Sequence, residues 1–432
     1  MVNIIISQLT DISIKPKGIS LNRLKNLSKV VYFFPTFAQR KYAHIMSKTT
    51  KVLVIILAII VGLVVVKLVW VGCATKGNGS LESEKADILR RRDYLIEKVV
   101  TDPHRLIDEM PTLIGPQFQG EWALYSCSML SATLVNTTLL YQEDREQAIT
   151  LIDSLIQIVM SPTLRAYDYM RWGEDPLNSL EGDNSHVSYL SHLAWMIGGY
   201  KHLGGGDKYD ALYHSLCATM NRRLLQSPNL NLPTYPGEPV YVPDMLVAIV
   251  ALKIYSQQNE GKYASTVDQW LYEARHQWLS EPTGIIASFL PDEGSFIAAD
   301  AVVKGSYSAL SCYYLTFIDA TFAREQYELL KSNFLQRKPI TGFKEYCDRR
   351  CWFGLDIDAG PILFNLSPTA TAFAIGSATY FDDAELRKQL LKTAEMAGTT
   401  FSRKGKSHYL LADMALVGEA ITLAMRTATE WK

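Results

Sequence analysis

Residues 82–427 alternate between two kinds of predicted helix, and this alternation limits the possible folds more than any other feature. Apolar segments rich in small residues predict buried helices, because a helix that is hydrophobic on all sides has no face for water. They span 118–140, 185–203, 243–257, 304–318, 367–380 and 409–427. Charged, amphipathic segments predict outer helices that bury one stripe. They span 82–100, 143–158, 206–226, 260–280, 321–337 and 383–400.

Strict alternation of six inner and six outer helices predicts an all-α fold, an (α/α)6 toroid with one ring of helices inside another. The first outer helix would close the ring against the last inner helix. A two-domain helical bundle would not require the alternation to persist from residue 82 to residue 427, so the toroid is preferred. With 432 residues and 48% hydrophobic content, the chain can build such a core.

Two long inserts interrupt the helical pattern, at 283–300 and 338–362. In both, apolar residues alternate around glycine and proline turns, which predicts short β-hairpins. Loops of this length in a compact domain are usually functional. The connections before the inner helices are therefore expected to surround one mouth of the ring, where a ligand pocket would form.

The segment that begins at Asp183 combines a helix start with polar side chains. Asp183 or Asn184 is expected to cap the buried helix by accepting hydrogen bonds from its first-turn N–H groups. Tyr189 and His192 follow three residues apart, so they share one face of this helix. These groups could hold a polar ligand, but they also fit a capped core helix with a satisfied histidine.

Acidic and aromatic residues collect in the other predicted connections to the inner helices. The expected ionisable core of a candidate site consists of His192, Asp244, Asp356 and Asp358. Ligand-positioning roles are expected for Trp172, Asp183, Asn184, Tyr189, Glu238 and Tyr241. The same kind of connection holds Asp292, Glu293 and His408. For any single acid the alternative interpretation is a helix cap or a turn.

These residue types suit acid–base chemistry. Elimination of water needs one group that protonates the leaving oxygen and another that accepts a proton. Burial moves carboxylates and imidazoles toward the pKa values that such a reaction needs. Asp244 with His192 would supply one pair, and Asp356 with Asp358 would supply another.

Two other classes of function remain open. Two carboxylates across a groove lined by Trp172, Tyr241 and Trp352 would equally suit cleavage of a glycosidic bond. A binding or scaffold protein that keeps the toroid without catalysis is the third possibility. In each case a small molecule or a carbohydrate is the expected ligand.

Several of these motifs resemble the linalool dehydratase/isomerase family. The stretch Trp172-Gly173-Glu174-Asp175-Pro176 followed by Asp183-Asn184 carries the resemblance, as does Glu238-Pro239 ahead of Pro243. The similarity covers roughly residues 118–430 and is concentrated in 171–255. It implies an (α/α)6 barrel that dehydrates and isomerises a small terpene alcohol.

The resemblance also implies roles for particular residues. His192 and Tyr189 would stand at acid/base positions, and Glu238 would lie near the substrate. In that family two cysteines flank the Glu-Pro segment, whereas this chain has Gly237 and Asp244 at those places. The departure puts both cysteine-assisted chemistry and linalool itself in question.

Other classes are excluded by charge and by missing motifs. The formal net charge is −1, and no long single-sign run follows residue 75, which argues against a nucleic-acid partner. The sequence has no P-loop, GxSxG elbow, HExxH or dinucleotide fingerprint, and no histidines at metal-ligand spacing. We therefore expect no cofactor and no metal.

The only close pair of cysteines is Cys347 and Cys351. An oxidising compartment would permit a disulfide between them if the loop turns tightly, because the Cα atoms must approach within about 7 Å. Six cysteines in 432 residues are too few for a disulfide scaffold.

Residues 52–72 predict a transmembrane helix, since about 20 apolar residues span a bilayer. Lys67 is the only charge in this segment. Residues 1–51 contain nine Lys or Arg and one acid, Asp11, so this segment is expected in the cytoplasm. The helical domain would then lie on the extracytoplasmic, periplasmic side. A signal peptide, or a lipoprotein signal ending at Cys73, is the alternative.

The expected domain boundaries follow from these segments. Residues 1–51 form a cytoplasmic segment, and Met46-Ser47-Lys48 has the character of a natural start, so the true start stays open. Residues 52–72 form the anchor, 73–81 a short tether, and 82–432 the toroid domain. The oligomeric state is not determined by the sequence.

Overall fold

The computed structural model describes residues 62, 66–67, 81–108, 110–111, 114–296, 299 and 302–431, and the predicted all-α class is confirmed. The predicted anchor at 52–72 falls outside the described residues except for Gly62, Val66 and Lys67. The apolar helices are α3 (Pro116–Tyr141), α6 (Val187–His202), α8 (Val242–Gln258), α10 (Gly305–Ile318), α12 (Pro368–Tyr380) and α14 (Leu416–Arg426). The charged helices are α2 (Leu81–Ile96), α4 (Arg145–Val159), α7 (Asp210–Gln226), α9 (Ala264–His276), α11 (Ala320–Phe334) and α13 (Ala384–Gly398).

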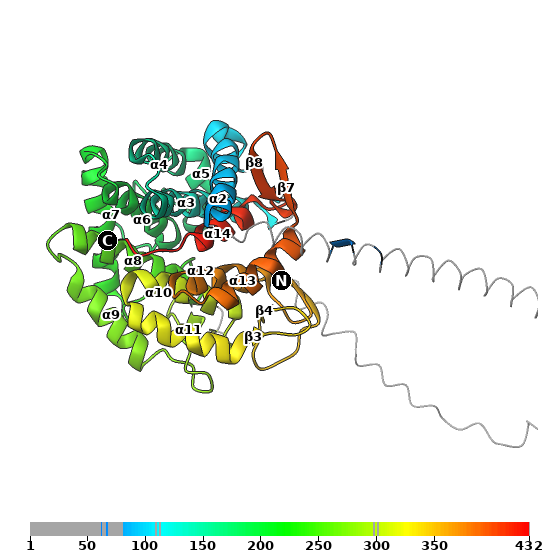
Figure 1. Ribbon diagram of the computed structural model, residues 1–432. Helices are drawn as coiled ribbons and strands as arrows, with labels where there is room; N and C mark the ends of the chain where they lie inside the picture. Colours follow the sequence, from blue (N-terminus) through cyan, green and yellow to red (C-terminus); the bar gives the residue numbers. More distant parts are fainter. Residues whose placement is uncertain are drawn as a thin grey trace, which may run out of the picture. The chain divides into compact units, whose positions relative to one another are not determined.

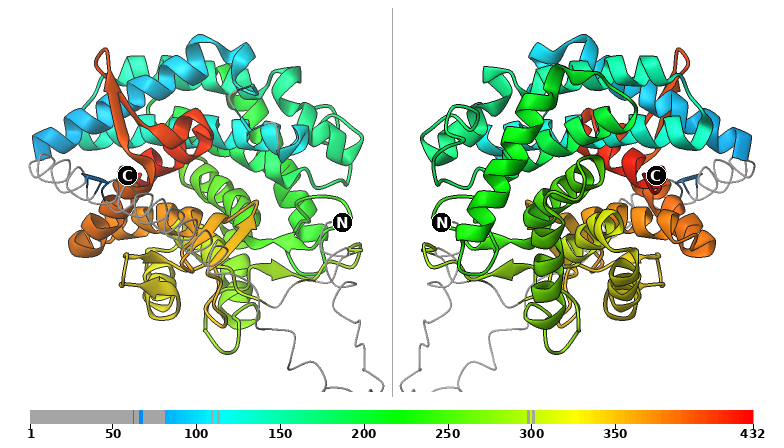
Figure 2. Two further views of the ribbon diagram at one scale, coloured as in Figure 1. Left: turned by 90° about the vertical axis from the view of Figure 1, so that its right-hand side faces the viewer. Right: turned by 90° about the vertical axis from the view of Figure 1, so that its left-hand side faces the viewer.

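The apolar helices pack against one another in chain order. Helix α3 contacts α6, and the contacts continue through α8, α10 and α12 to α14, which packs back against α3. Each charged helix lies against an apolar one (Figure 1): α4 on α3, α7 on α6, α9 on α8, α11 on α10, α13 on α12 and α2 on α14. Figure 2 shows the first and last of these elements, α2 in blue and α14 in red, lying together.

Helix α5 (Pro162–Trp172) was not predicted. Ser161 caps it by accepting a hydrogen bond from the Leu164 N–H, Pro162 begins it, and Gly173 ends it at φ 76°. Helix α5 packs against α3. Trp172 therefore lies at the end of a helix and not in a connection. The segment of α5 is charged and aromatic, but it is flanked by capping residues at both ends.

The strands are short and lie in the connections. β1 (Val240–Tyr241) pairs with β2 (Phe289–Leu290), and β3 (Leu335–Gln336) pairs with β4 (Gly342–Phe343), both antiparallel. β5 (Phe353–Asp356) and β6 (Gly360–Leu363) form a hairpin in which Phe353 lies opposite Leu363. β7 (Thr400–Arg403) and β8 (Lys406–Tyr409) form another. Short 3-10 turns cover Pro103–Arg105, Asp207–Tyr209 and Leu410–Asp413, and a π-turn covers Glu97–Thr101.

The two predicted inserts differ in outcome. The insert at 338–362 does contain a hairpin, β5–β6. In the insert at 283–300, Phe289–Leu290 pairs instead with Val240–Tyr241 from the connection before α8. That pairing ties two connections together, and Tyr241 thereby lies beside Phe289, with ring centroids 5.3 Å apart.

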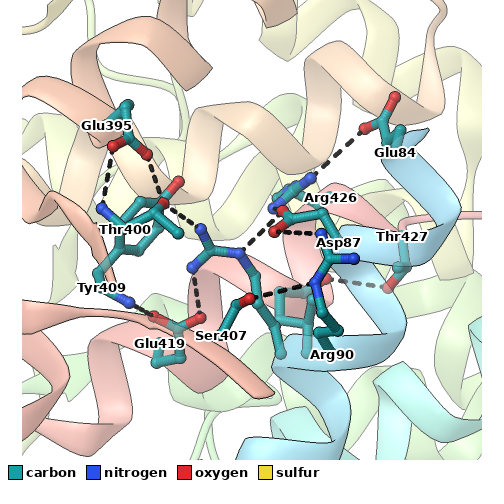
Figure 3. A network of polar contacts seen from close by, with 12 residues as sticks. Glu84, Asp87, Arg90, Glu395, Thr400, Ser407, Tyr409, Glu419, Arg426 and Thr427 are labelled. Atoms are coloured by element: carbon teal, nitrogen blue, oxygen red, sulfur yellow. Dashed lines mark hydrogen bonds and ion pairs between the residues drawn. The ribbon is translucent and has the colours of Figure 1, made fainter. Parts of the chain in front are cut away.

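A buried ion network joins α2 to α14 (Figure 3). Asp87 accepts hydrogen bonds from Arg91 at 2.9 Å and from Arg426 at 2.7 Å. Arg91 also donates to Glu419 at 2.8 Å. Burial would raise the pKa of Asp87, but the charges of Arg426 and Arg91 lower it to about 2. The network thus holds the first charged helix against the last apolar one.

One described helix is apolar and long enough to cross a membrane by length and composition, α3 at Pro116–Tyr141. The bent pair α4–α5, Arg145–Val159 with Pro162–Trp172, would pass the same test as one span. The apolar window of α3 is 83% buried, and the helix packs between α14 and α6. Because the core helix of a soluble domain passes the same test, we treat α3 as a core helix.

Five cysteines fall within the described residues, and all five are free thiols. Cys347 and Cys351 are half-buried and form no disulfide.

Candidate acidic site

Glu121 is the single charged residue in α3, and the sequence analysis did not select it. Its side chain keeps some accessible surface, whereas most residues of this helix are buried. Burial, together with the nearby charges of Asp244 and Asp358, raises the pKa of the Glu121 carboxyl to about 8, although the Tyr235 phenol and Arg171 act to lower it. Glu121 is therefore mostly a neutral carboxylic acid at pH 7. Its isolation within an apolar helix was the sequence signal that could have revealed it.

Asp244 stands in the first turn of α8, but it is not a helix cap. Its Oδ1 accepts a hydrogen bond from the Tyr125 hydroxyl at 3.0 Å, and its Oδ2 accepts one from the Thr234 hydroxyl at 3.0 Å. Burial raises the pKa of Asp244 to about 6, although both hydroxyls act to lower it, and the charge of Asp358 contributes to the rise. Asp244 is therefore mostly ionised at pH 7.

Asp358 reaches the same region from the turn of the β5–β6 hairpin. Its Oδ2 accepts hydrogen bonds from the Tyr307 hydroxyl at 2.9 Å and from the Lys304 ammonium at 3.3 Å. Burial raises its pKa, partly offset by Lys304. The Lys304 ammonium also donates to Asp356 at 2.9 Å. These contacts fix the hairpin turn on the start of α10.

Asp356 has a different environment from Asp358. Its Oδ1 accepts hydrogen bonds from the backbone N–H groups of Asp358 and Ala359, as a turn-forming aspartate does. Burial acts to raise its pKa, but Lys304 and the two backbone donors lower it overall. Asp356 therefore stays ionised, so the structure assigns it to shaping the turn.

His192 is buried in α6 and contacts the site through Tyr125. The two rings lie 4.4 Å apart, and the Nδ1 of His192 hydrogen-bonds the Ser128 hydroxyl at 2.9 Å. Burial lowers the pKa of His192 to about 3, so the imidazole is neutral. No hydrogen bond joins His192 to Asp244 in the described residues; the pair proposed from the sequence is bridged by Tyr125.

The buried His192 Nε2 and the buried Tyr314 hydroxyl have no hydrogen-bond partner among the described residues. Burial raises the pKa of Tyr314, and the charge of Asp244 adds to the rise, so Tyr314 lies within electrostatic range of that carboxylate. A buried polar atom without a partner is costly, and such atoms often meet a ligand or water. Together with Asp244 and Glu121 they offer a polar ligand both donors and acceptors.

Arg171 supplies a positive charge at the edge of this cluster. Its guanidinium stacks over the Tyr235 ring at 4.0 Å and donates to Glu238 at 3.3 Å. The hydroxyl of Tyr241 also donates to Glu238, at 2.7 Å. Tyr241 in turn lies 6.1 Å from the ring of Tyr307. Glu238 and Tyr241 are thereby brought next to the cluster that holds Asp244 and Asp358.

Other residues selected from the sequence lie apart from this cluster by their contacts. The Tyr189 hydroxyl donates to the Val159 carbonyl at 2.9 Å, so Tyr189 faces α4. Asp183 is exposed and contacts Arg222 at 3.2 Å. Asn184 donates to Glu174 at 2.6 Å. The expected cap is wrong: α6 begins at Val187, and its N-cap residue is His186.

His186 is the buried histidine that the sequence analysis overlooked. It adopts φ 47°, and its Nδ1 lies 2.5 Å from Asp168 while its Nε2 lies 3.2 Å from Glu174. Trp172 packs 5.2 Å from its ring. Between two carboxylates, His186 fastens the connection before α6 to the end of α5. This region is a structural clamp beside the acidic site.

His408 and Asp292 also lie elsewhere. His408 stacks on Tyr94 at 4.0 Å, beside the α2–α14 network. The Asp292 carboxylate accepts a hydrogen bond from the Gly294 N–H, as in a turn. Within the described part of the chain, no group of three or more His, Cys, Asp or Glu residues is arranged to hold a metal ion.

The acidic site, defined as Glu121, Tyr125, Asp244, Tyr307 and Asp358, therefore joins α3, α8, α10 and the β5–β6 turn. It contains a carboxyl group that is neutral at pH 7 and another that is ionised, with pKa values near 8 and 6. Two titratable groups with such separated pKa values can serve as acid and base in one reaction. A scan against protein-family models finds no match for this chain, and a search of curated proteins finds none either.

Proposed function

We propose that this protein is an acid–base lyase or isomerase that acts on a small neutral alcohol at the acidic site. Glu121 would protonate the departing hydroxyl oxygen, and water would leave as the C–O bond breaks. Asp244 would accept the proton from the neighbouring carbon as the double bond forms. The step balances, because a neutral alcohol becomes a neutral alkene and water while Glu121 loses a proton and Asp244 gains one. The proton would return from Asp244 to Glu121 through solvent before the next turnover.

The observation that carries this proposal is the pKa difference between Glu121 and Asp244. Burial acts on both carboxyl groups, but only Asp244 has two hydroxyl donors, Tyr125 and Thr234, that favour its ionised form. Glu121 faces the charge of Asp244, which favours its neutral form. The acid and the base are thus in the correct protonation states together near pH 7.

A neutral substrate fits the charges around the site better than an anionic one. The carboxylates of Asp244 and Asp358 would repel an anion, and the two nearby cations already have carboxylate partners. Arg171 is paired with Glu238, and Lys304 with Asp356 and Asp358. The free His192 Nε2 and Tyr314 hydroxyl would bind substrate oxygen atoms.

We further propose that the helical unit is the (α/α)6 toroid that the sequence predicts, with the acidic site at its inner surface. The packing order of the apolar helices supports this arrangement, since α14 returns to α3. The resemblance to the linalool dehydratase/isomerase family agrees with elimination chemistry on an alcohol. Asp244 would then perform with a carboxylate the work that a cysteine position serves in that family.

A screen for turnover tests the proposed function. The purified full chain is incubated with acyclic terpene alcohols, polyols and oligosaccharides, and products are identified by mass spectrometry. We expect loss of water or its re-addition with one of the alcohols. Glu121→Gln and Asp244→Asn should each lower kcat/KM by about a hundredfold or more. The control Asp183→Asn, at an exposed position, should leave kcat/KM unchanged.

The other outcomes separate the alternatives. Release of a sugar from an oligosaccharide, lost in the same two variants, would favour the glycoside hydrolase. No turnover, and no shift of the melting temperature with any compound, would favour the binding or scaffold protein.

A further inference from the structure

A cavity lined by none of the acidic-site residues lies between α12, α13 and α14. It has a volume of about 360 Å³, at the lower end of the range of about 300–1,000 Å³ for small-molecule pockets. Its walls include Ile375, Ala397 and Ile421. At its mouth stand Leu363 and Phe364 from the end of β6 and Leu411 from the turn after β8.

Several polar groups that line this cavity already have hydrogen-bond partners. Glu419 accepts hydrogen bonds from Arg91 at 2.8 Å and from the Tyr409 N–H at 2.8 Å, and Figure 3 shows the contact between Glu419 and Tyr409. The Ser367 hydroxyl donates to the Ala359 carbonyl, and the Thr422 hydroxyl donates to the Gly418 carbonyl. Because these groups already have partners, the cavity is suited to an apolar ligand.

Large apolar side chains are exposed on both sides of the mouth. On the β5–β6 side, Phe353 is 79% exposed and Leu355 is 85% exposed, and the exposed Trp352 directly precedes β5. On the other side, Leu410, Leu411 and Met414 are exposed. We call these two groups, with Leu363 and Phe364, the apolar face. Soluble domains rarely expose so many large apolar groups together unless something covers them.

The charges beside the apolar face favour a lipid surface as its partner. The exposed cations Arg349 and Arg350 precede Trp352, and Arg403 and Lys404 form the tip of the β7–β8 hairpin. The exposed acids near these cations in the chain are Asp348, directly before Arg349, and Asp413, in the turn after β8. Aromatic side chains with basic neighbours are typical of the interface between lipid headgroups and acyl chains.

The chain before α2 supports the same partner. The predicted bilayer segment ends at Gly72, and α2 begins at Leu81. The eight residues between them reach at most about 28 Å when extended. Near the start of α2, Glu84 forms an ion pair with Arg387 of α13, the helix whose later residues line the cavity. Helix α13 therefore contacts the start of α2 and also lines the cavity.

We propose that the apolar face rests on the lipid bilayer and that the cavity takes one acyl chain of a phospholipid from it. The cations would contact anionic headgroups, while Phe353, Leu355 and Met414 enter the acyl boundary. The bilayer is the single partner to which this proposal commits. It goes beyond the proposed reaction and does not depend on catalysis at the acidic site.

Two methionines provide a matched test of the docking. Met414 of the apolar face is 70% exposed, and Met170 of α5 is 55% exposed. The full chain is placed, one copy per disc, in nanodiscs of mixed neutral and anionic phospholipid. Hydroxyl-radical oxidation of both methionines is then followed by mass spectrometry. We expect Met414 to react several-fold more slowly than Met170; equal or faster reaction of Met414 would overturn the docking.

A variant pair checks that the apolar face causes this protection. Phe353→Asp with Leu355→Asp should restore oxidation of Met414, and the helical circular dichroism should not change because both side chains are exposed. Continued protection of Met414 in that variant would also overturn the proposal, since a second protein copy cannot be present in the disc.

The acyl-chain site is tested with a phospholipid that carries a photoreactive diazirine near the end of one chain. We expect adducts on the peptides of α12 and α14 that contain Ile375 and Ile421. Ala372→Phe would fill the cavity and lower this labelling several-fold while Met414 stays protected. Labelling that is absent, or unchanged by Ala372→Phe, would overturn the acyl-chain site.

Discussion

The Asp244 carboxylate in the first turn of α8 lies within electrostatic range of the Glu121 carboxyl of α3, although the two residues are far apart in the chain. The charge of Asp244 raises the pKa of Glu121, and burial raises the pKa of both. Asp244 remains the stronger acid because Tyr125 and Thr234 donate hydrogen bonds to it. In the proposed reaction this asymmetry makes Glu121 of α3 the acid and Asp244 of α8 the base.

A bell-shaped dependence of kcat/KM on pH is the first expected outcome. Activity should fall below about pH 6 because Asp244 becomes protonated, and above about pH 8 because Glu121 ionises. The two apparent values belong to the coupled pair and not to either residue alone. The measurement is kcat/KM from pH 4.5 to 9.5 on the substrate found in the screen. A rate that stays constant across that range would contradict these roles.

Tyr125→Phe should move one side of that profile. The hydroxyl of Tyr125 lowers the pKa of Asp244, so its removal should raise that pKa and shift the acidic limb to higher pH. The matched control is Tyr189→Phe, which removes a buried hydroxyl that donates to the Val159 carbonyl. It should cost about 1 kcal/mol of stability but leave the limb in place. If both variants shift the limb equally, the bond to Asp244 has no special role.

Glu121→Gln should stabilise the protein at alkaline pH. The folded-state pKa of Glu121 is raised to about 8, whereas the pKa of an unfolded glutamate is about 4.3. The stability cost of Glu121 is therefore absent at pH 4, grows as pH rises between these values, and is complete above pH 8. The melting temperature of the variant should exceed that of the native chain at pH 8.5 and match it at pH 4. An equal difference at both pH values would contradict the raised pKa.

The sequence predicted the helices well and the acidic site only in part. Apolar and charged segments show which helices are buried, because burial needs no knowledge of the partner. The site depends instead on which way each buried side chain points. Tyr189 and His192 share a helix, yet Tyr189 bonds to α4 and His192 contacts Tyr125 of α3. Only the packing of α6 between its neighbours decides this.

Glu121 and Asp183 illustrate the two kinds of error. Glu121 was passed over because an acid in an apolar helix carries no motif, and its partners come from distant segments. Asp183 was selected because an aspartate before a buried helix usually caps it. The helix begins later, at Val187, since His186 is held between Asp168 and Glu174. Asp244 was selected for its position, and its partners could be known only from the structure.

Asp87→Asn should strongly destabilise the helical unit. The substitution leaves the buried guanidinium groups of Arg91 and Arg426 without their shared carboxylate, and breaking such a pair from one side costs about 3–5 kcal/mol. The native pKa of Asp87 is about 2, below the value of about 3.9 for an unfolded aspartate. Its contribution is therefore complete above pH 4 and is lost as pH falls through 2. Urea unfolding at pH 7 and pH 2.5 should show a large difference between the native chain and the variant at pH 7 and a smaller one at pH 2.5.

Glu325→Gln provides the control, because Glu325 is an exposed partner of Arg275 and its loss should cost less than about 1 kcal/mol at either pH. A loss at Asp87 no larger than the loss at Glu325 would mean that the α2–α14 contact is held by apolar packing and not by this network.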